Sequence, residues 1–299
     1  LVYKEDLIMD INYELYKVFY HVAVTLSFSE ASKQLFISQS AVSQSIKVLE
    51  KKLNQPLFIR STKKVQLTPE GEILLKHIEP AMNLIKKGEN QLLEAHTLNG
   101  GQLRIGASDT ICRYYLVPYL NRFHKEFPNI HIKVINQTSI ECAKFLENGQ
   151  ADFIVANYPN SALAGSMNTR VINEFHDVFV ASRSAFPLKG SKLALEELLR
   201  YPIMMLDRKS TTSEFLHQVF QKSQLDLVPE IELSSNDLLI DLARIGLGIA
   251  FVPDFCIPKN DEDLFILDLK EQLPSRQMMV AYNESLPVSQ AARQFMDML

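Results

Sequence analysis

Apolar residues repeat with the spacing of an α-helix in three successive segments near the start of the chain. The first segment spans 13–25, the second begins at Ser27 or Ser29 and runs to about residue 35, and the third spans about 39–53 with Ser38 as its N-cap. Two short strands with a basic turn between them follow in "PLFIRSTKKVQLT". Helices joined by a tight turn and followed by a basic hairpin predict a winged helix-turn-helix.

A longer amphipathic helix is predicted from Thr68 to about residue 98. Thr68 is its N-cap and Pro69 occupies its first turn. Near-heptad spacing favours pairing with a second copy of the chain, and packing on its own domain is the alternative. The apolar positions that carry this pattern are Leu75, Ile78, Met82, Ile85 and Leu92. The sequence Asn99-Gly100-Gly101 predicts its end and a hinge.

Strand and helix patterns alternate from residue 102 to the C-terminus. Such alternation predicts open, mostly parallel sheets, and there are enough units for two of them. We expect the chain to return to the first half at its end. The predicted fold class is therefore α/β, with a winged helix-turn-helix (9–67), a linker helix (68–98) and a two-subdomain Rossmann-like domain. Its first subdomain comprises 101–168 and 269–299, and its second comprises 169–268.

One face of the third helix is polar and stands opposite its apolar stripe. Ser40, Ser43, Gln44 and Lys47 recur at helical spacing on that face. Residues 10–67 carry eight Lys and Arg against four acids, a net charge of +4, whereas residues 68–299 carry −7. A basic head on an acidic body indicates that one end meets a polyanion. Lysines in the hairpin are suited to phosphate, which supplies affinity rather than sequence information.

Polar residues follow the predicted strands of the C-terminal domain. In open parallel sheets, ligands bind at the carboxyl ends of the strands. Hydroxyls, amides and helix N-termini suit a small anion such as an organic acid, although capping alone is the ordinary role of such residues. Asp109 opposes an anion there, and Arg113 and Arg208 are expected to offset it. The candidate ligand-binding residues are Ser108, Thr110, Gln137, Thr138, Asn157, Thr211, Thr212, Ser235 and Asn236.

Other function classes find little support. The chain of 299 residues is 46% hydrophobic and 22% charged, a globular composition, and it holds no nucleotide-binding or hydrolase motif and no metal-type histidine pair. We therefore expect no enzyme activity, cofactor or metal. Three widely spaced cysteines and no recognisable signal peptide favour the cytoplasm. Met9 is a candidate natural start, in which case residues 1–8 are either an upstream extension or an added, non-native segment.

Cys112 supplies an alternative function. Its predicted place near a helix N-terminus would acidify the thiol, so redox sensing through Cys112 is a second hypothesis. No other cysteine lies near it in sequence to resolve an oxidised form. Cys142 and Cys256 are predicted to be core residues.

The residues "SQSAVSQSIKVLE", "LFIR" and "LTPEG" resemble the N-terminal domain of LysR-type transcriptional regulators. The similarity extends through "LRIGAS", "LENGQADFIV" and "GLGIAFVP", from about Met9 to Leu299. It implies a bacterial regulator, dimeric or tetrameric, with a C-terminal domain like a type 2 periplasmic binding protein. It also implies double-stranded DNA with an inverted-repeat operator, a small-molecule effector and RNA polymerase as partners.

Carried onto this chain, the resemblance places Gln39, Ser43 and Gln44 at the bases and Arg60 at phosphate. Ser40 stands where the family often has proline, and Gln44 where it often has arginine, so adenine would replace guanine as the preferred base. A solute-binding protein and an enzyme on the α/β domain are the competing functions. The full set of candidate DNA-binding residues is Ser38, Gln39, Ser40, Ser43, Gln44, Lys47, Arg60, Ser61, Lys63 and Lys64.

Overall fold

The structure is a computed structural model that describes residues 11–60, 64–96, 101–163, 167–258 and 261–299. The chain divides between Asn90 and Gln91 into two compact units. None of the described helices is long and apolar enough to cross a membrane.

The first unit opens with three helices, α1 (Tyr13–Thr25), α2 (Phe28–Leu35) and α3 (Gln39–Leu53). The hydroxyl of Ser27, rather than that of Ser29, accepts a hydrogen bond from the backbone of Glu30 and caps α2. Strands β1 (Phe58–Arg60) and β2 (Val65–Leu67) form an antiparallel hairpin. A fully buried cluster joins the helices, and its members include Phe19, Val22, Val42, Ile46 and Leu49. The predicted winged helix-turn-helix is thus confirmed.

Helix α4 (Pro69–His96) has the predicted start and length. The hydroxyl of Thr68 accepts from the backbone of Gly71 at 3.0 Å and donates to the carbonyl of Pro56 at 2.8 Å. A Cβ atom at Gly71 would lie 2.3 Å from the carbonyl oxygen of Leu57, so only glycine fits this close approach. Most of the predicted Asn99-Gly100-Gly101 hinge lies outside the described residues.

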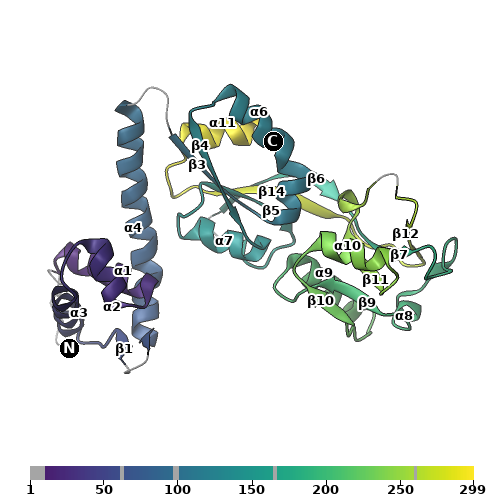
Figure 1. The fold of residues 1–299 in the computed structure, drawn as a ribbon, viewed down its shortest axis with the longest axis horizontal. Helices are drawn as coiled ribbons and strands as arrows, with labels where there is room; N and C mark the ends of the chain where they lie inside the picture. Colours follow the sequence, from purple (N-terminus) through teal and green to yellow (C-terminus); the bar gives the residue numbers. More distant parts are fainter. Residues whose placement is uncertain (1–10, 61–63, 97–100, 164–166, 259–260) are drawn as a thin grey trace, which may run out of the picture. The chain divides into compact units, whose positions relative to one another are not determined.

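The second unit contains two five-stranded sheets (Figure 1). The first has the order β4-β3-β5-β14-β6, in which β3, β4 and β5 are parallel and β14 is antiparallel to both of its neighbours. Helices α6 and α11 cover one face and α7 the other (Figure 1). The elements are β3 (Gly101–Ala107), α5 (Asp109–Ile111), a π-helical segment (Cys112–Leu116), α6 (Val117–Glu126), β4 (Ile130–Asn136), α7 (Ser139–Glu147), β5 (Phe153–Tyr158), β6 (Met167–Phe175), β14 (Arg276–Asn283) and α11 (Gln290–Met298).

The second sheet repeats this plan with the order β10-β9-β11-β7-β12. Strands β9, β10 and β11 are parallel, and β7 is antiparallel to its two neighbours. A small parallel pair, β8 with β13, lies beside it. The elements are β7 (Asp177–Ser182), β8 (Lys192–Leu193), α8 (Leu195–Leu198), β9 (Ile203–Leu206), α9 (Thr211–Lys222), β10 (Ile231–Leu233), α10 (Asn236–Arg244), β11 (Ile249–Pro253), a 3-10 turn (Asp254–Cys256), β12 (Leu264–Ile266) and β13 (Asp268–Leu269).

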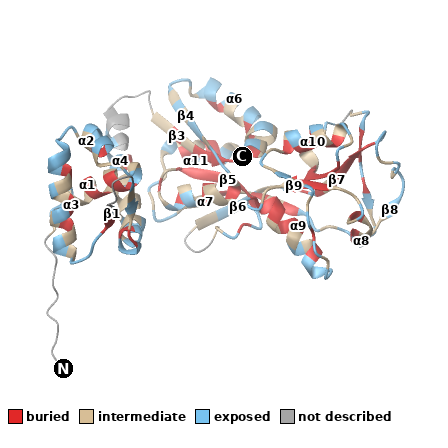
Figure 2. Cartoon of the chain, turned by 60° about the horizontal axis from the view of Figure 1, so that its bottom comes forward, coloured by how far each residue is buried: buried red, intermediate tan, exposed pale blue. Residues whose placement is uncertain are grey.

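The crossing between the subdomains lies later than the sequence indicated. Strand β6 continues to Phe175 and pairs with β14 over its whole length, so it belongs to the first sheet. The boundary at 168 and 169 is corrected to His176, because the sheet to which β6 belongs is decided by its backbone pairing with β14 and not by its side-chain pattern. Buried residues are concentrated on interior strands of the sheets, such as β5 and β7 (Figure 2).

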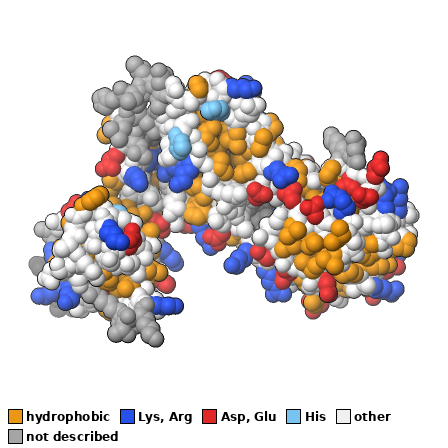
Figure 3. Space-filling view, in the orientation of Figure 1, with side chains coloured by type: hydrophobic (Ala, Val, Ile, Leu, Met, Phe, Trp, Pro, Cys, Tyr) orange, Lys and Arg blue, Asp and Glu red, His pale blue; other side chains and the backbone are white. Residues whose placement is uncertain are grey.

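Apolar side chains also remain on the surface of both units. On α4, Ile73, Leu84, Ile85 and Leu92 are exposed, whereas Leu75 and Ile78 pack on the helix-turn-helix core. On the second unit, apolar side chains gather near α10 (Figure 3), where Leu238, Ile245 and Leu247 are exposed. Contiguous exposed apolar surface is a common mark of interaction sites.

Candidate functional site

The outer face of α3 presents polar side chains to solvent. Gln39, Ser40, Gln44 and Lys47 are exposed, and Ser43 is half-buried. The hydroxyl of Ser38 accepts from the backbone of Ala41 at 3.2 Å and lies 2.9 Å from that of Ser40. Ser38, one of the candidate DNA-binding residues, therefore also caps the N-terminus of α3.

Glu50 joins the last turns of α3 to the hairpin. Its carboxylate accepts from the backbone N–H groups of Leu57 and Phe58 at 2.9 and 3.3 Å. The wing therefore starts at a fixed place relative to the polar face. In the sequence, this glutamate is recognisable only as the last residue of the motif "SQSAVSQSIKVLE". Lys64 is exposed on the hairpin, while Ser61, Lys63 and the side chain of Arg60 lie outside the described residues.

A cleft of about 220 Å³ lies between the two subdomains of the second unit. Among the predicted ligand-binding residues, Ser235 alone does not line it, because its hydroxyl caps α10 and its neighbour Ser234 takes that place. The predicted residues on its walls are Ser108, Thr110, Gln137, Thr138, Asn157, Thr211, Thr212 and Asn236. The other lining residues are Asp109, Asn136, Ser139, Leu206, Asp207, Ser210 and Ser234.

Hydrogen bonds connect the two subdomains across the cleft. The amide nitrogen of Asn236 donates to the hydroxyl of Thr110 at 2.9 Å, and the phenol of Tyr114 donates to Asp237 at 2.6 Å. The predicted offset of Asp109 by arginines is not found, because Arg113 pairs with Asp237 and Arg208 with Glu232. Asp109 instead accepts from the side chain of Asn136 at 3.2 Å. No lysine, arginine or histidine is among the described residues that line the cleft.

Arg276, which the sequence reasoning missed, lies behind the α9 wall of the cleft. Its guanidinium donates to Asp177 at 2.7 Å, to Thr212 at 3.0 Å and to Thr211 at 2.9 Å. Both charged side chains are completely buried. The pKa of Asp177 is raised by burial, and the neighbouring Arg276 opposes that rise. A lone charge at the head of an apolar strand was the only signal of this pair in the sequence.

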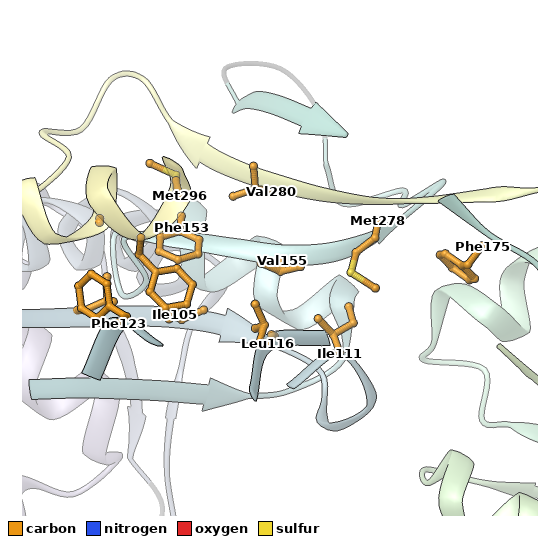
Figure 4. Packing of buried hydrophobic residues seen from close by; sticks show 14 residues of the cluster. Ile105, Ile111, Leu116, Phe123, Phe153, Val155, Phe175, Met278, Val280 and Met296 are labelled. Atoms are coloured by element: carbon orange, nitrogen blue, oxygen red, sulfur yellow. The ribbon is translucent and has the colours of Figure 1, made fainter. Parts of the chain in front are cut away.

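The rings of Phe175 and Phe215 cover the same guanidinium at 5.4 and 5.1 Å from their centroids. Phe175 extends from the apolar cluster of the first subdomain, beyond Ile111 and Met278 (Figure 4). The arginine is thus held by both subdomains at their crossing.

Cys112 does not have the acidified thiol that its sequence position predicted. Burial, followed by the negative charge of Asp109, raises the pKa of Cys112 to about 11. The residue begins the π-helical segment rather than a first helical turn. Cys142 and Cys256 are buried, in agreement with their predicted core roles.

A larger hollow of about 940 Å³ lies beside β6, β14 and α11. None of the predicted ligand-binding residues lines it. Arg170 donates to the carbonyl of Met296, and Asn168 to Glu284, so part of its polar lining is already satisfied. The hydroxyl-rich cleft is therefore the stronger candidate for a small ligand.

Two family models match the chain. Residues 13–72 match the bacterial regulatory helix-turn-helix proteins of the lysR family, and residues 96–299 match the LysR substrate binding domain. The match of both domains to one family favours a regulator over a solute-binding protein.

Similar proteins agree with these matches. A "Probable RuBisCO transcriptional regulator" of Cyanidioschyzon merolae is 29% identical, with 93% of this chain and 94% of that protein covered. The HTH-type transcriptional activator CmpR of Synechocystis is 27% identical, with 95% and 93% covered. The structure of full-length CbnR with its target DNA superposes with a TM-score of 0.65 at 17% identity, over 96% of this chain and 98% of that one. The chain therefore belongs to the LysR family of transcriptional regulators.

Proposed function

We propose that this regulator binds double-stranded DNA with the polar face of α3 in the major groove and the wing on the phosphate backbone. The observation that carries the proposal is the exposed row of Gln39, Ser40, Gln44 and Lys47 above a buried apolar stripe. Glutamine can pair with the N6 and N7 edge of adenine, whereas hairpin cations contact phosphate. CbnR, which has the same fold, is solved with its target DNA. Ser38, Ser43, Arg60, Ser61, Lys63 and Lys64 complete the proposed surface.

A binding selection with randomised operators tests this surface. Gln44→Ala is expected to flatten the base preference at one position of each half-site and to leave the others unchanged. Glu30→Ala, on the exposed face of α2, is the matched control, since it keeps α3 intact. An unchanged preference at every position in the Gln44 variant would contradict the proposed reading of adenine.

The cleft is proposed to hold a small organic acid as effector. Three helices of at least nine residues, α7, α9 and α10, begin at its walls, and their N-termini carry partial positive charge. Binding of the acid would shift the relative angle of the subunits. That shift would change the bending of the operator and the contact with RNA polymerase in the cytoplasm. By linkage, operator and effector must change each other's affinity by the same factor. Equal effector affinities with and without operator would contradict the coupling.

Self-association is proposed through α4. Its first turns pack on their own domain, so the intramolecular alternative holds for Leu75 and Ile78. Its later turns expose Leu84, Ile85 and Leu92, which supports pairing with a second copy there. Two copies would present two α3 helices to an inverted-repeat operator.

A further inference from the structure

Three serine and threonine hydroxyl groups in the cleft already accept hydrogen bonds from the protein. Ser108 accepts from the backbone of Ile111 at 3.3 Å, and Thr138 from that of Glu141 at 3.3 Å. The hydroxyl of Ser139 accepts from the backbone of Asn157 at 3.2 Å. Each hydroxyl has one hydrogen, and none of these three donates it to another group within the part of the chain that the structure describes. Their hydrogens are therefore available to a ligand.

The two threonines at the start of α9 also accept a hydrogen bond through their hydroxyl oxygens, in this case from Arg276. A guanidinium can only donate, so Thr211 and Thr212 must act as acceptors toward it. Their own hydrogens are left as donors, and both residues line the cleft. Because Asp177 balances the buried charge of Arg276, the cleft gains oriented neutral donors rather than a bare cation.

Two amide oxygens in the cleft are acceptors that lack a hydrogen-bond donor. Asn157 and Asn236 are only 6% and 4% exposed, and the Oδ1 atom of each has no hydrogen-bond partner among the described residues. A buried acceptor without a donor is unfavourable and rare in native proteins. A carboxylate cannot supply that donor, so a ligand that satisfies this cleft must also carry one.

We propose that the cleft selects a small monocarboxylic acid with a hydroxyl group, and that Arg276 is a positioning residue for its carboxylate. The carboxylate accepts from Thr211 and Thr212, and the ligand hydroxyl donates to the amide oxygen of Asn157 or Asn236. Asp109 and Asp207 on the walls oppose negative charge and so disfavour a second carboxylate, and the volume of about 220 Å³ suits a small ligand. This inference rests on the proposed function of the cleft as the effector site.

Isothermal titration of the full chain with matched acids tests the proposal. Lactate, propionate and alanine share a three-carbon skeleton, and 3-hydroxybutyrate with butyrate forms a four-carbon pair. Each hydroxy acid is expected to bind about tenfold or more tightly than its plain counterpart, because the plain acid carries no donor for the unpartnered oxygens. Equal binding of plain and hydroxy acids would overturn the hydroxyl requirement and leave the cleft as an acid site. Tighter binding of alanine, or no binding by any hydroxy acid, would overturn the proposed ligand class.

Variants separate the two parts of the proposal. Thr212→Val and Arg276→Lys are expected to weaken lactate and propionate binding by the same factor, whereas Asn157→Leu lowers the lactate preference toward unity. Thr169→Val, at an exposed position of β6, is the matched control and should change neither affinity. Arg276→Lys with lowered thermal stability but unchanged affinities would show that Arg276 is only structural and would overturn its positioning role. Operator binding by the same variants, measured without acid, reports on the proposed function independently.

Discussion

At the scale of single residues, the cleft is organised by side chains that have little or no contact with solvent. Arg276 and Asp177 neutralise each other where neither touches water, and two aromatic rings cover the guanidinium. Burying either charge alone is costly, because no solvent replaces the lost partner. The pair therefore makes each residue dependent on the other.

Asp177→Ala is expected to destabilise the second unit by about 3–5 kcal/mol, since Arg276 would remain buried without a counter-ion. Chemical denaturation followed by circular dichroism measures this change. Asp226→Ala, at an exposed position after α9, is the control and should change stability by less than about 0.5 kcal/mol. Equal stability of the two variants would show that the buried pair contributes little.

The thiol of Cys112 is expected to react slowly at neutral pH. Its pKa of about 11 lies above the ordinary value of 9.0, so its thiolate fraction at pH 7 is roughly a hundredfold below that of a free cysteine. Alkylation by iodoacetamide, followed by mass spectrometry, should accelerate as the pH rises toward 11. Rapid labelling at pH 7 would restore the redox hypothesis for this residue.

At the scale of elements, the helix-turn-helix was the most predictable part of the fold. Apolar spacing gave the bounds of α1, α2 and α3 because each helix buries one stripe on the others. The sheet to which β6 belongs was less accessible, since it is decided by backbone pairing with β14 rather than by the side chains of β6. The side chains of β6 are mostly exposed or half-buried, and they carry no pattern that identifies β14 as the partner strand.

Glu50→Ala is expected to destabilise the winged domain by about 1–3 kcal/mol, because the backbone N–H groups of Leu57 and Phe58 lose their acceptor. Thermal unfolding of the variant measures the loss, and operator affinity should fall as the wing loosens. Glu30→Ala removes only an exposed ion pair with Lys33 and is the control. The same small effect in both variants would argue against a role for Glu50 in anchoring the wing.

At the scale of the whole molecule, α4 is part of a domain core, and its exposed turns are the surface proposed for a second copy. The exposed side chains of Leu84 and Ile85 belong to turns beyond those that pack on the helix-turn-helix. Pairing of two such helices would bury this apolar surface, which is favourable at about 25 cal/mol per Å² of apolar area. Oligomer formation and operator binding would then depend on the same helix.

Ile85→Asp is expected to shift the chain from dimer toward monomer, because a carboxylate cannot be buried in an apolar helix pair without a partner. Sedimentation velocity over a range of concentrations measures the shift. Val228→Asp, which changes an exposed residue of the second unit, tests whether added charge alone has this effect. If the two variants sediment alike, the proposed pairing through α4 is wrong.

The sequence by itself determined the order of elements, the winged helix-turn-helix, the two-sheet domain and most residues of the cleft. These follow from local periodicity and from the rule that parallel strands place their carboxyl ends at one edge. Only the tertiary structure decided the roles of Arg276 and Asp177, the raised pKa of Cys112 and the unpartnered oxygens of Asn157 and Asn236. Those properties depend on burial and on partners far apart in the chain, such as Arg276 and Asp177 at a separation of 99 residues, and neither burial nor a distant partner leaves a local pattern in the sequence.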